Sequence, residues 1–429
     1  MTDQQLLGVN TFSGKTEIKN ALIKKVSDLD FEIVIEKIFN YMHCSKRLIE
    51  KAISNSRIRN NLIILFLLFK SNFLFSQEEN NWIQFKDQKT YLIGYKDWKG
   101  EVKIKPKFAS ITNAKIFKNI IPVFEEVKDS SSKIKRYYLL KNGKQIGADS
   151  LYVSDTKLDC ENENKIRFRD YKTDKVGFFD GSGKIVIPAI YDDAKPFYNG
   201  FSVVITDGKR MCSNASGVLS KENPCEEWRW KGNIKIINHK NEVLSENIPL
   251  EKLNAIDWFS VKENSKETNE NYIDFKSPNG DVYSFLSYQK EFKNWFCDQF
   301  LSDISVTSQM SFLSDEIYFD VNEILDDESD VRHKNASWKQ EKKGKFLEDH
   351  KEYFLKVITL FKNHNIEIYE GTSPMMFRYN SNPEYFSDCG EYQNIKFPYF
   401  KVYLIDKNKV IKCLGFIKTD NKFKLLEIH

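Results

Sequence analysis

The hydrophobic pattern changes twice along the chain. Between residues 91 and 217, short aromatic and β-branched runs alternate with polar positions and are separated by ten glycines, which predicts short strands joined by tight turns. From residue 233 onward only five glycines remain, and apolar residues recur at helical spacing over 287–301 and 338–363. Alternation then returns in three runs near the C-terminus, at 400–405, 410–417 and 423–428.

This pattern predicts a multidomain protein. We expect an all-β repeat block of stacked β-hairpin or meander units over 82–232, followed by an α+β domain over 233–429. The second domain should contain two amphipathic helices and a C-terminal antiparallel meander. The inward residues expected on the second helix are Phe346, Leu347, Phe354, Val357, Ile358 and Phe361.

Two segments of the predicted β-block share one pattern of turn residues. An aromatic strand enters an Asp-x-x-Gly turn, in which the aspartate accepts hydrogen bonds from nearby backbone N–H groups and the glycine adopts a positive φ. An alternating strand follows, and a proline is expected to end its pairing. The positions are Gly94, Asp97, Gly100 and Pro106 in the first copy, and Gly177, Asp180, Gly183, Pro188, Tyr191 and Gly200 in the second.

Two weaker copies extend the series. Gly143 marks a copy that lacks the first glycine and the proline, and Gly217 marks a shorter fourth copy. The successive turn glycines are 43, 40 and 34 residues apart, and periods of this size indicate a repeat architecture. Each copy is expected to bury its apolar face by stacking on its neighbours.

The pattern resembles the WG-repeat family, bacterial β-repeats that read Gly-Phe/Tyr-Ile-Asp-x-x-Gly-x-x-Val-Ile-x-Pro-x-Tyr-Asp. The resemblance covers about residues 91–230 and is strongest at 177–200. The tryptophan that names the family is replaced by Ile93 and by Val176. The resemblance implies a binding or scaffolding module, and it carries over no catalytic residue.

The C-terminal ending is similar in pattern to nuclear-transport-factor-2-like domains. In those domains helices are followed by an antiparallel meander, as expected for residues 287–429. This resemblance implies a cone-shaped fold that holds a small-molecule pocket.

A short apolar segment at 57–76 has the features of an export signal. Basic residues precede eight consecutive apolar residues at 62–69, and Ser76 stands before Gln77. These features are typical of a secretory signal peptide, and the segment resembles those of Bacteroidetes bacteria that end in Phe-Ser-Gln. The 14 residues of 62–75 are fewer than the roughly 20 that cross a bilayer. We therefore expect a periplasmic or secreted protein, cleaved near Ser76 and Gln77.

The position of this segment leaves two interpretations open. Either the true start is Met42, and residues 1–60 are an N-terminal extension that is not part of the protein, or residues 1–60 are real and 62–75 anchor the chain in a membrane. In both cases, contact with the membrane is expected only through this segment.

Charge and composition narrow the classes of partner. Lysine and arginine number 65 and aspartate and glutamate 61, which leaves a net charge of +4 at pH 7. This near balance lacks the basic excess of nucleic-acid-binding proteins. Apolar residues make up 41% of the chain and aromatic residues 14%, which excludes wholesale disorder.

Six of the seven cysteines follow the expected cleavage point. An even number in an exported chain favours disulfides, with Cys212 to Cys225 and Cys389 to Cys413 as the local pairings, and buried thiols are the alternative. No CxxC pair occurs, which argues against zinc ribbons and thioredoxin-like sites.

The sequence offers few groups for catalysis or for a metal. Residues 82–230 contain no histidine, and His350 and His364 on the second predicted helix are about 21 Å apart, too far to share one metal. We therefore expect no cofactor, metal or catalytic site. Trp98, Trp228 and Trp230 are candidate partner contacts, because exposed rings stack on glycans or proteins. Alternatively, these rings cap the ends of the repeat stack.

Together these patterns predict an exported, non-enzymatic repeat protein of the cell envelope. Its β-repeat surface would bind a protein or a cell-surface polymer, and not nucleic acid. The alternative is small-molecule binding or hydrolysis in the C-terminal domain, with the repeats as an accessory module. A deep pocket within that domain would favour the alternative, and a filled core there would favour the first hypothesis.

Overall fold

The described part of the protein is mostly β-structure, with few helices, all of them from residue 250 onward. The structure is a computed structural model that describes residues 80–126, 134–154, 157–213, 217–220, 223–253, 256–265, 270–321, 337–406 and 409–429. The expectations for 1–60, Met42, 57–76 and the cleavage near Ser76 and Gln77 lie outside these residues. Within the described ranges, no helix has the length and apolar character needed to cross a bilayer.

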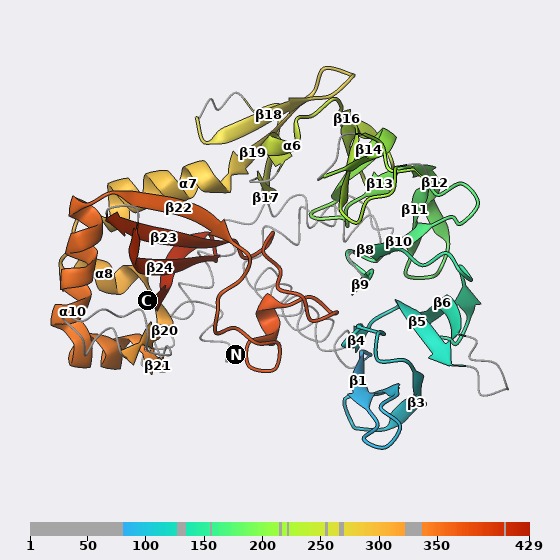
Figure 1. Cartoon of the computed structure of the whole chain (residues 1–429), viewed down its shortest axis with the longest axis horizontal. Coiled ribbons are helices and arrows are strands. Elements are labelled where there is room, and N and C mark those ends of the chain that lie inside the picture. The colour runs from blue at the N-terminus through green and yellow to red at the C-terminus, as the bar shows by residue number, and fades with distance from the viewer. Residues whose placement is uncertain are drawn as a thin grey trace, which may run out of the picture. The chain divides into compact units, whose positions relative to one another are not determined.

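Small antiparallel sheets follow one another through the first two thirds of the described chain (Figure 1). Their elements are β1 (Trp82–Lys86), β2 (Ile93–Lys96), β3 (Val102–Phe108), β4 (Ile116–Phe117), β5 (Ile120–Glu126), β6 (Ile134–Leu140), β7 (Gln145–Ile146), β8 (Val153–Ser154), β9 (Lys157–Leu158), β10 (Lys165–Arg169), β11 (Val176–Asp180), β12 (Ile185–Tyr191), β13 (Asp193–Ala194), β14 (Phe201–Cys212), β15 (Trp228–Asn238), β16 (Val243–Ser245), α6 (Leu250–Leu253), β17 (Ile256–Glu263), β18 (Tyr272–Lys276) and β19 (Val282–Ser287).

A second group of elements forms the C-terminal domain. They are α7 (Tyr288–Trp295), the π-helical segment η1 (Phe296–Phe300), α8 (Val306–Phe312), β20 (Leu313–Asp320), β21 (Trp338–Lys342), α10 (Lys343–Asn363), β22 (Ile366–Gly371), the 3-10 turn η3 (Pro383–Tyr385), β23 (Tyr399–Asp406), β24 (Lys409–Thr419) and β25 (Lys422–Ile428).

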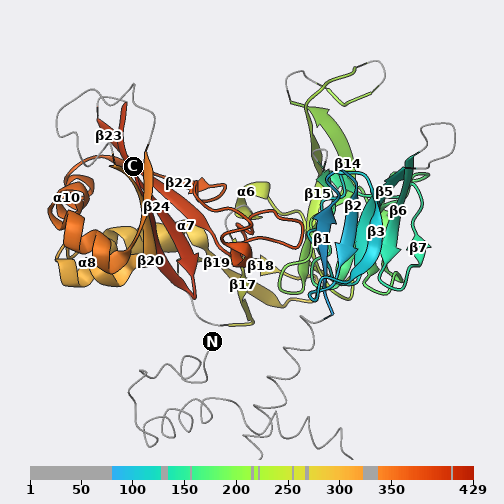
Figure 2. The ribbon, with the colours of Figure 1, turned by 90° about the horizontal axis from the view of Figure 1, so that it is seen from below.

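The repeat unit is a three-stranded meander. The strand orders β1-β2-β3, β5-β6-β7, β10-β11-β12 and β14-β15-β16 each place the middle strand at the centre. The first two of these units join edge to edge in one sheet (Figure 2). A further three-stranded sheet has the order β17-β19-β18. The expected all-β block of meander units is therefore confirmed.

The repeats continue beyond the predicted end of the block. The boundary expected between residues 232 and 233 falls inside β15, which pairs with β14 along most of its length. Turns of the repeat type also occur at Asn238 and at Ser277. Their backbone N–H groups donate hydrogen bonds to the carbonyl oxygens of Glu242 and Asp281, respectively. Asn241 replaces the turn glycine with a φ of +68°, a conformation that asparagine tolerates better than most residues. Because this turn has no glycine, the spacing of glycines did not predict it.

The turn residues of the first copy act through the backbone. The Asp97 carboxylate accepts hydrogen bonds from the N–H groups of Lys99 and Glu101, both at 2.9 Å. Gly100 has a φ of +87°, and Gly183 in the second copy has a φ of +80°. The same short sequence therefore closes equivalent hairpins in both copies.

The prolines occupy a different position from the one expected. Pro106 and Pro188 lie inside β3 and β12, and pairing with the middle strand resumes beyond them at Phe108 and at Tyr191. The register shifts across each proline, as in a β-bulge. Because proline has no N–H to donate, it is tolerated at such a bulge, where the ladder is already interrupted. The prediction that proline ends the pairing is therefore wrong.

The C-terminal domain packs helices on one face of a six-stranded sheet. The strand order is β21-β20-β25-β24-β23-β22, with β20 parallel to β25 and the other pairs antiparallel. Aromatic and aliphatic side chains fill the space between sheet and helices, including all six inward residues expected on the second helix. That helix begins at Lys343, because residues 338–342 pair with β20 as strand β21. The prediction of helix over 338–342 is therefore wrong.

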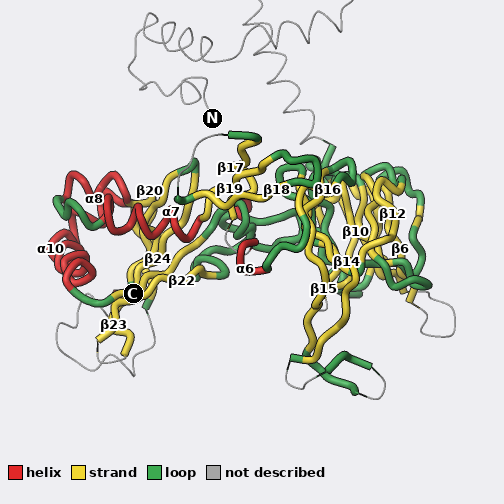
Figure 3. Tube along the Cα trace, turned by 90° about the horizontal axis from the view of Figure 1, so that it is seen from above, coloured by secondary structure: helices red, strands yellow, loops and turns green. Residues whose placement is uncertain are grey.

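Strands β14 and β15 form the longest hairpin of the repeat block, and Figure 3 shows it extending well beyond the neighbouring strands. Its outer part contains the Cys212–Cys225 disulfide, which is the local pairing expected from the sequence. Gly217 lies between the two cysteines with a φ of +126°. The expected fourth copy at Gly217 is therefore the tip of this hairpin and not a separate unit.

Candidate functional site

A cleft of about 900 Å³ lies between the repeat block and a long connection of the C-terminal domain. This connection, residues 372–398, joins β22 to β23 and is here called the strap. The cleft is lined by residues from 152–167 and 195–203 of the repeats and from 379–396 of the strap. Repeats and strap together therefore form its walls.

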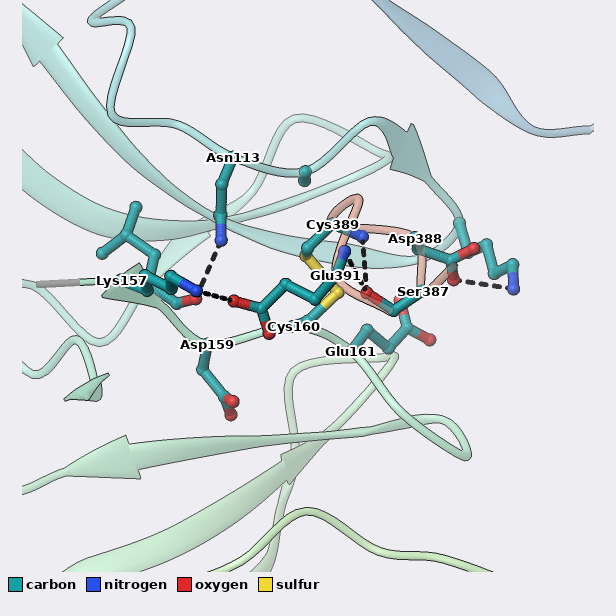
Figure 4. The surroundings of a disulfide bond; sticks show 12 residues. Asn113, Lys157, Asp159, Cys160, Glu161, Ser387, Asp388, Cys389 and Glu391 are labelled. Carbon is teal, nitrogen blue, oxygen red and sulfur yellow. Dashed lines mark hydrogen bonds and ion pairs between the residues drawn. A yellow bond between two sulfur atoms is a disulfide. The ribbon is translucent and has the colours of Figure 1, made fainter. Parts of the chain in front are cut away.

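The strap is fixed to the repeats by backbone contacts and ion pairs. The carbonyl oxygen of Asp388 accepts hydrogen bonds from the N–H groups of Lys115 and Ile116, at 2.7 and 3.0 Å. The Asp388 carboxylate pairs with Lys118 at 2.7 Å, and Glu391 pairs with Lys157 at 2.9 Å (Figure 4).

A disulfide between Cys160 and Cys389 completes this attachment (Figure 4). It joins residues 229 positions apart in the sequence. The expected pairing of Cys389 with Cys413 is therefore wrong. Cys413 is buried in β24, while Cys389 lies at the tip of the strap, against the repeats. Sequence proximity misled the prediction because the strap leaves its own sheet.

A buried ion pair forms part of the cleft wall. Arg167 binds the Asp159 carboxylate through its side chain, and its backbone N–H also donates to Asp159 at 2.8 Å. The guanidinium donates to the carbonyl oxygen of Ala194 at 2.7 Å and lies 4.0 Å from the centre of the Tyr152 ring. Since these partners hold the charge of Arg167 in place, the pair orders the wall and is unsuited to proton transfer.

Tyrosine hydroxyls supply polar groups in the cleft. Burial raises the pKa of Tyr198 and of Tyr379, one from the repeats and one from the strap. Both phenols therefore stay protonated at neutral pH and can donate hydrogen bonds. Each also presents an aromatic face, a combination suited to sugars and to peptide groups.

Charges along the cleft nearly balance, with six acids and five bases among the lining residues. Three acidic and three basic lining residues pair with each other, and Glu161 accepts hydrogen bonds from the N–H groups of Asn119 and Ile120. The other charged lining residues are the two lysines Lys195 and Lys396 and the two acids Glu370 and Glu384. The cleft therefore does not favour a ligand of either charge.

The candidate aromatics lie apart from the cleft lining. Trp228 and Trp230 contact each other edge to face on β15, and the Arg210 guanidinium lies about 5 Å from both rings. Trp98 is exposed in the Asp97–Gly100 turn, beneath Lys99.

The cleft could not be predicted from the sequence, because its tyrosines have no distinctive spacing.

The comparison with protein families agrees with the geometry of the second copy. Residues 177–209 match the model of the family described as WG containing repeat. The chain contains a WG repeat. The matched stretch runs from β11 through β12 and β13 into β14, so this WG repeat ends on the first strand of the next meander. A search of curated proteins gives no match to this chain.

Proposed function

We propose that the protein is an exported, non-enzymatic binding protein of the cell envelope, and that the cleft between WG repeats and strap holds an uncharged stretch of a cell-surface polymer. The observation that carries the proposal is the cleft itself, which two separate parts of the chain form and a disulfide fixes. A fixed cleft lowers the entropy lost on binding.

The chemistry of the lining supports an uncharged ligand. Balanced charges disfavour nucleic acid and other polyanions, while Tyr198 and Tyr379 offer both ring faces and hydroxyl donors. Two disulfides in the described residues suit an oxidising compartment. This fits export by the segment at 57–76, with 62–75 as an anchor in the alternative case.

Binding to isolated envelope polysaccharide tests this proposal. The protein is sedimented with the insoluble polymer, and Tyr198→Ala and Tyr379→Ala should each weaken binding about tenfold, as expected for contact residues at the centre of an interface. Tyr171→Ala, at an exposed turn residue outside the cleft, is the matched control and should bind normally. Equal binding by all three variants would contradict a role for the cleft. If the cleft binds another protein and not the polysaccharide, the proposed ligand is wrong.

The site of processing tests export. N-terminal sequencing of the mature protein from the envelope fraction should begin at or near Gln77. Recovery of a chain that still carries residues 1–60 would contradict cleavage and would favour the membrane anchor.

The alternative function receives less support. The interior of the C-terminal domain is filled by aromatic and aliphatic side chains, as the first hypothesis expects. The strap of that domain nevertheless contributes to the cleft, so the domain takes part in the proposed binding.

A further inference from the structure

Glu341, Asp349 and His350 converge in the C-terminal domain, where β21 runs into α10. One possible ligand atom from each residue lies within 4.8 Å of the others. The side chain of Glu341 is only 3% exposed and that of His350 is 20% exposed. The helical backbone is interrupted at His350, with φ −131° and ψ 21°. In a regular helix the neighbouring side chains of Asp349 and His350 would point about 100° apart. The interruption helps both of them to reach one point.

Buried polar atoms in this cluster lack hydrogen bonds. Oε2 of Glu341 and Nε2 of His350 are buried without a hydrogen-bond partner. Oε2 of Glu341 faces Nε2 of His350 at 3.7 Å, which is too long for a hydrogen bond. The His350 ring is held between the rings of Phe319 and Phe346, at 5.1 and 5.6 Å. Leaving such groups unbonded costs free energy unless a ligand binds them.

We propose that Glu341, Asp349 and His350 bind one divalent metal ion of the zinc or manganese class. Metal–ligand distances of about 2.0–2.2 Å place two ligands of one ion about 3–4 Å apart, and the gap between Glu341 and His350 lies in that range. One imidazole and two carboxylates are a donor set that suits these ions. Three protein ligands leave a coordination position for water or another ligand.

Two lysines supply the positive charge in the present geometry. Lys339 pairs with Oε1 of Glu341 at 2.7 Å, and Lys345 pairs with Asp349. Their side chains are 51% and 60% exposed, so both can turn to solvent when a metal ion enters. The Lys345–Asp349 pair is exposed on both sides and contributes little to stability. A divalent ion can replace this lysine, and can also replace Lys339 beside the buried Glu341 carboxylate. The site is separate from the proposed cleft and does not depend on it.

Calorimetric titration of the protein with zinc chloride, and separately with manganese chloride, tests the proposal. The protein carries Cys297→Ser, so that the exposed Cys297 thiol cannot bind zinc. We expect saturable binding of one ion per chain. His350→Gln and Glu341→Gln should each weaken binding at least about 100-fold, because even outer residues of metal sites change affinity by 10–100-fold. His364→Gln, at the C-cap of the same helix, is the matched control and should leave binding unchanged.

A substitution at an exposed residue still tests the proposal if the His350→Gln and Glu341→Gln proteins fail to fold. Lys345→Ala removes a competitor of the metal ion at Asp349 and should strengthen binding. Unchanged or weaker binding in that variant would overturn the proposal. So would binding that survives in a folded His350→Gln protein, or the lack of saturable binding of either ion.

Discussion

At the scale of the residue, the first glycine of the repeat is explained by the proline-containing bulge on the adjacent strand. A Cβ atom at Gly177 would lie 2.6 Å from the carbonyl oxygen of Ile187 and 2.8 Å from the backbone nitrogen of Ala189. A Cβ atom at Gly94 would likewise lie 2.6 Å from the carbonyl oxygen of Ile104 and 2.9 Å from the backbone nitrogen of Pro106. The bulge at the proline therefore brings backbone so close that only glycine fits.

We expect Gly177→Ala to lower the free energy of unfolding by about 2–4 kcal/mol, because backbone atoms must move to admit the methyl group. Urea unfolding followed by tyrosine and tryptophan fluorescence measures this change. The control is Gly344→Ala in α10, where a Cβ meets nothing within 4 Å. That variant should be stabilised by about 0.5–1 kcal/mol, as expected for alanine in a helix. Equal midpoints for the two variants would contradict the argument from the bulge.

The turns could be predicted from the sequence because their information is local. Asp97 and Gly100 determine one hairpin through contacts within five residues. The bulge at Pro106 could not be predicted, since register depends on the partner strand. The strap was hidden for a similar reason, because Cys389 carries no sign that it pairs with Cys160 across the fold. The cleft depends on this long-range contact and was therefore beyond the sequence.

At the scale of the element, a buried carboxylate on β25 holds the start of the strap. Glu427 is fully buried and accepts hydrogen bonds from the Tyr399 hydroxyl and from the backbone N–H of Met376, the latter at 3.3 Å. Burial raises the pKa of Glu427 above its ordinary value of 4.5, although these two donors favour the charged form. The neutral form of this carboxyl group is therefore more favoured in the sheet than it is in water.

The raised pKa gives Glu427 a defined effect on stability. Its contribution is complete below the ordinary pKa of 4.5 and is lost as the pH rises through the higher pKa of the folded state. We therefore expect the free energy of unfolding to decrease less in Glu427→Gln than in the wild type as the pH rises above the ordinary pKa of 4.5. Urea titrations at several pH values measure the slope. Glu348→Gln, at an exposed position of α10, should keep the wild-type slope, and an unchanged slope in Glu427→Gln would contradict the argument.

At the scale of the whole described molecule, two of the links between the repeats and the C-terminal domain differ in kind. Lys418 of β24 lies between Glu291 of α7, at 2.6 Å, and Asp257 of β17, at 3.4 Å, and its side chain is only 6% exposed. The second link is the Cys160–Cys389 disulfide. One is a buried ionic contact and the other a covalent bond, so they should respond differently to reducing agents.

Removing the long-range disulfide should destabilise the protein more than removing the local one. In the chain-entropy account, a bond across 229 residues contributes about 5 kcal/mol and one across 13 residues about 3 kcal/mol. We expect the double variant Cys160→Ser with Cys389→Ser to lose the larger amount in urea unfolding. It should also be cut by protease within the strap first. The matched control is Cys212→Ser with Cys225→Ser, and a larger loss in that control would contradict the prediction.

The wide spacing of Cys160 and Cys389 also constrains how the chain can mature. During synthesis, Cys160 emerges long before its partner, and Cys212, Cys225 and Cys297 appear in the interval. An oxidant that joined neighbouring thiols as they emerged would trap Cys160 in a wrong bond. Correct maturation therefore requires either oxidation after the chain is complete or an isomerase that reshuffles early bonds.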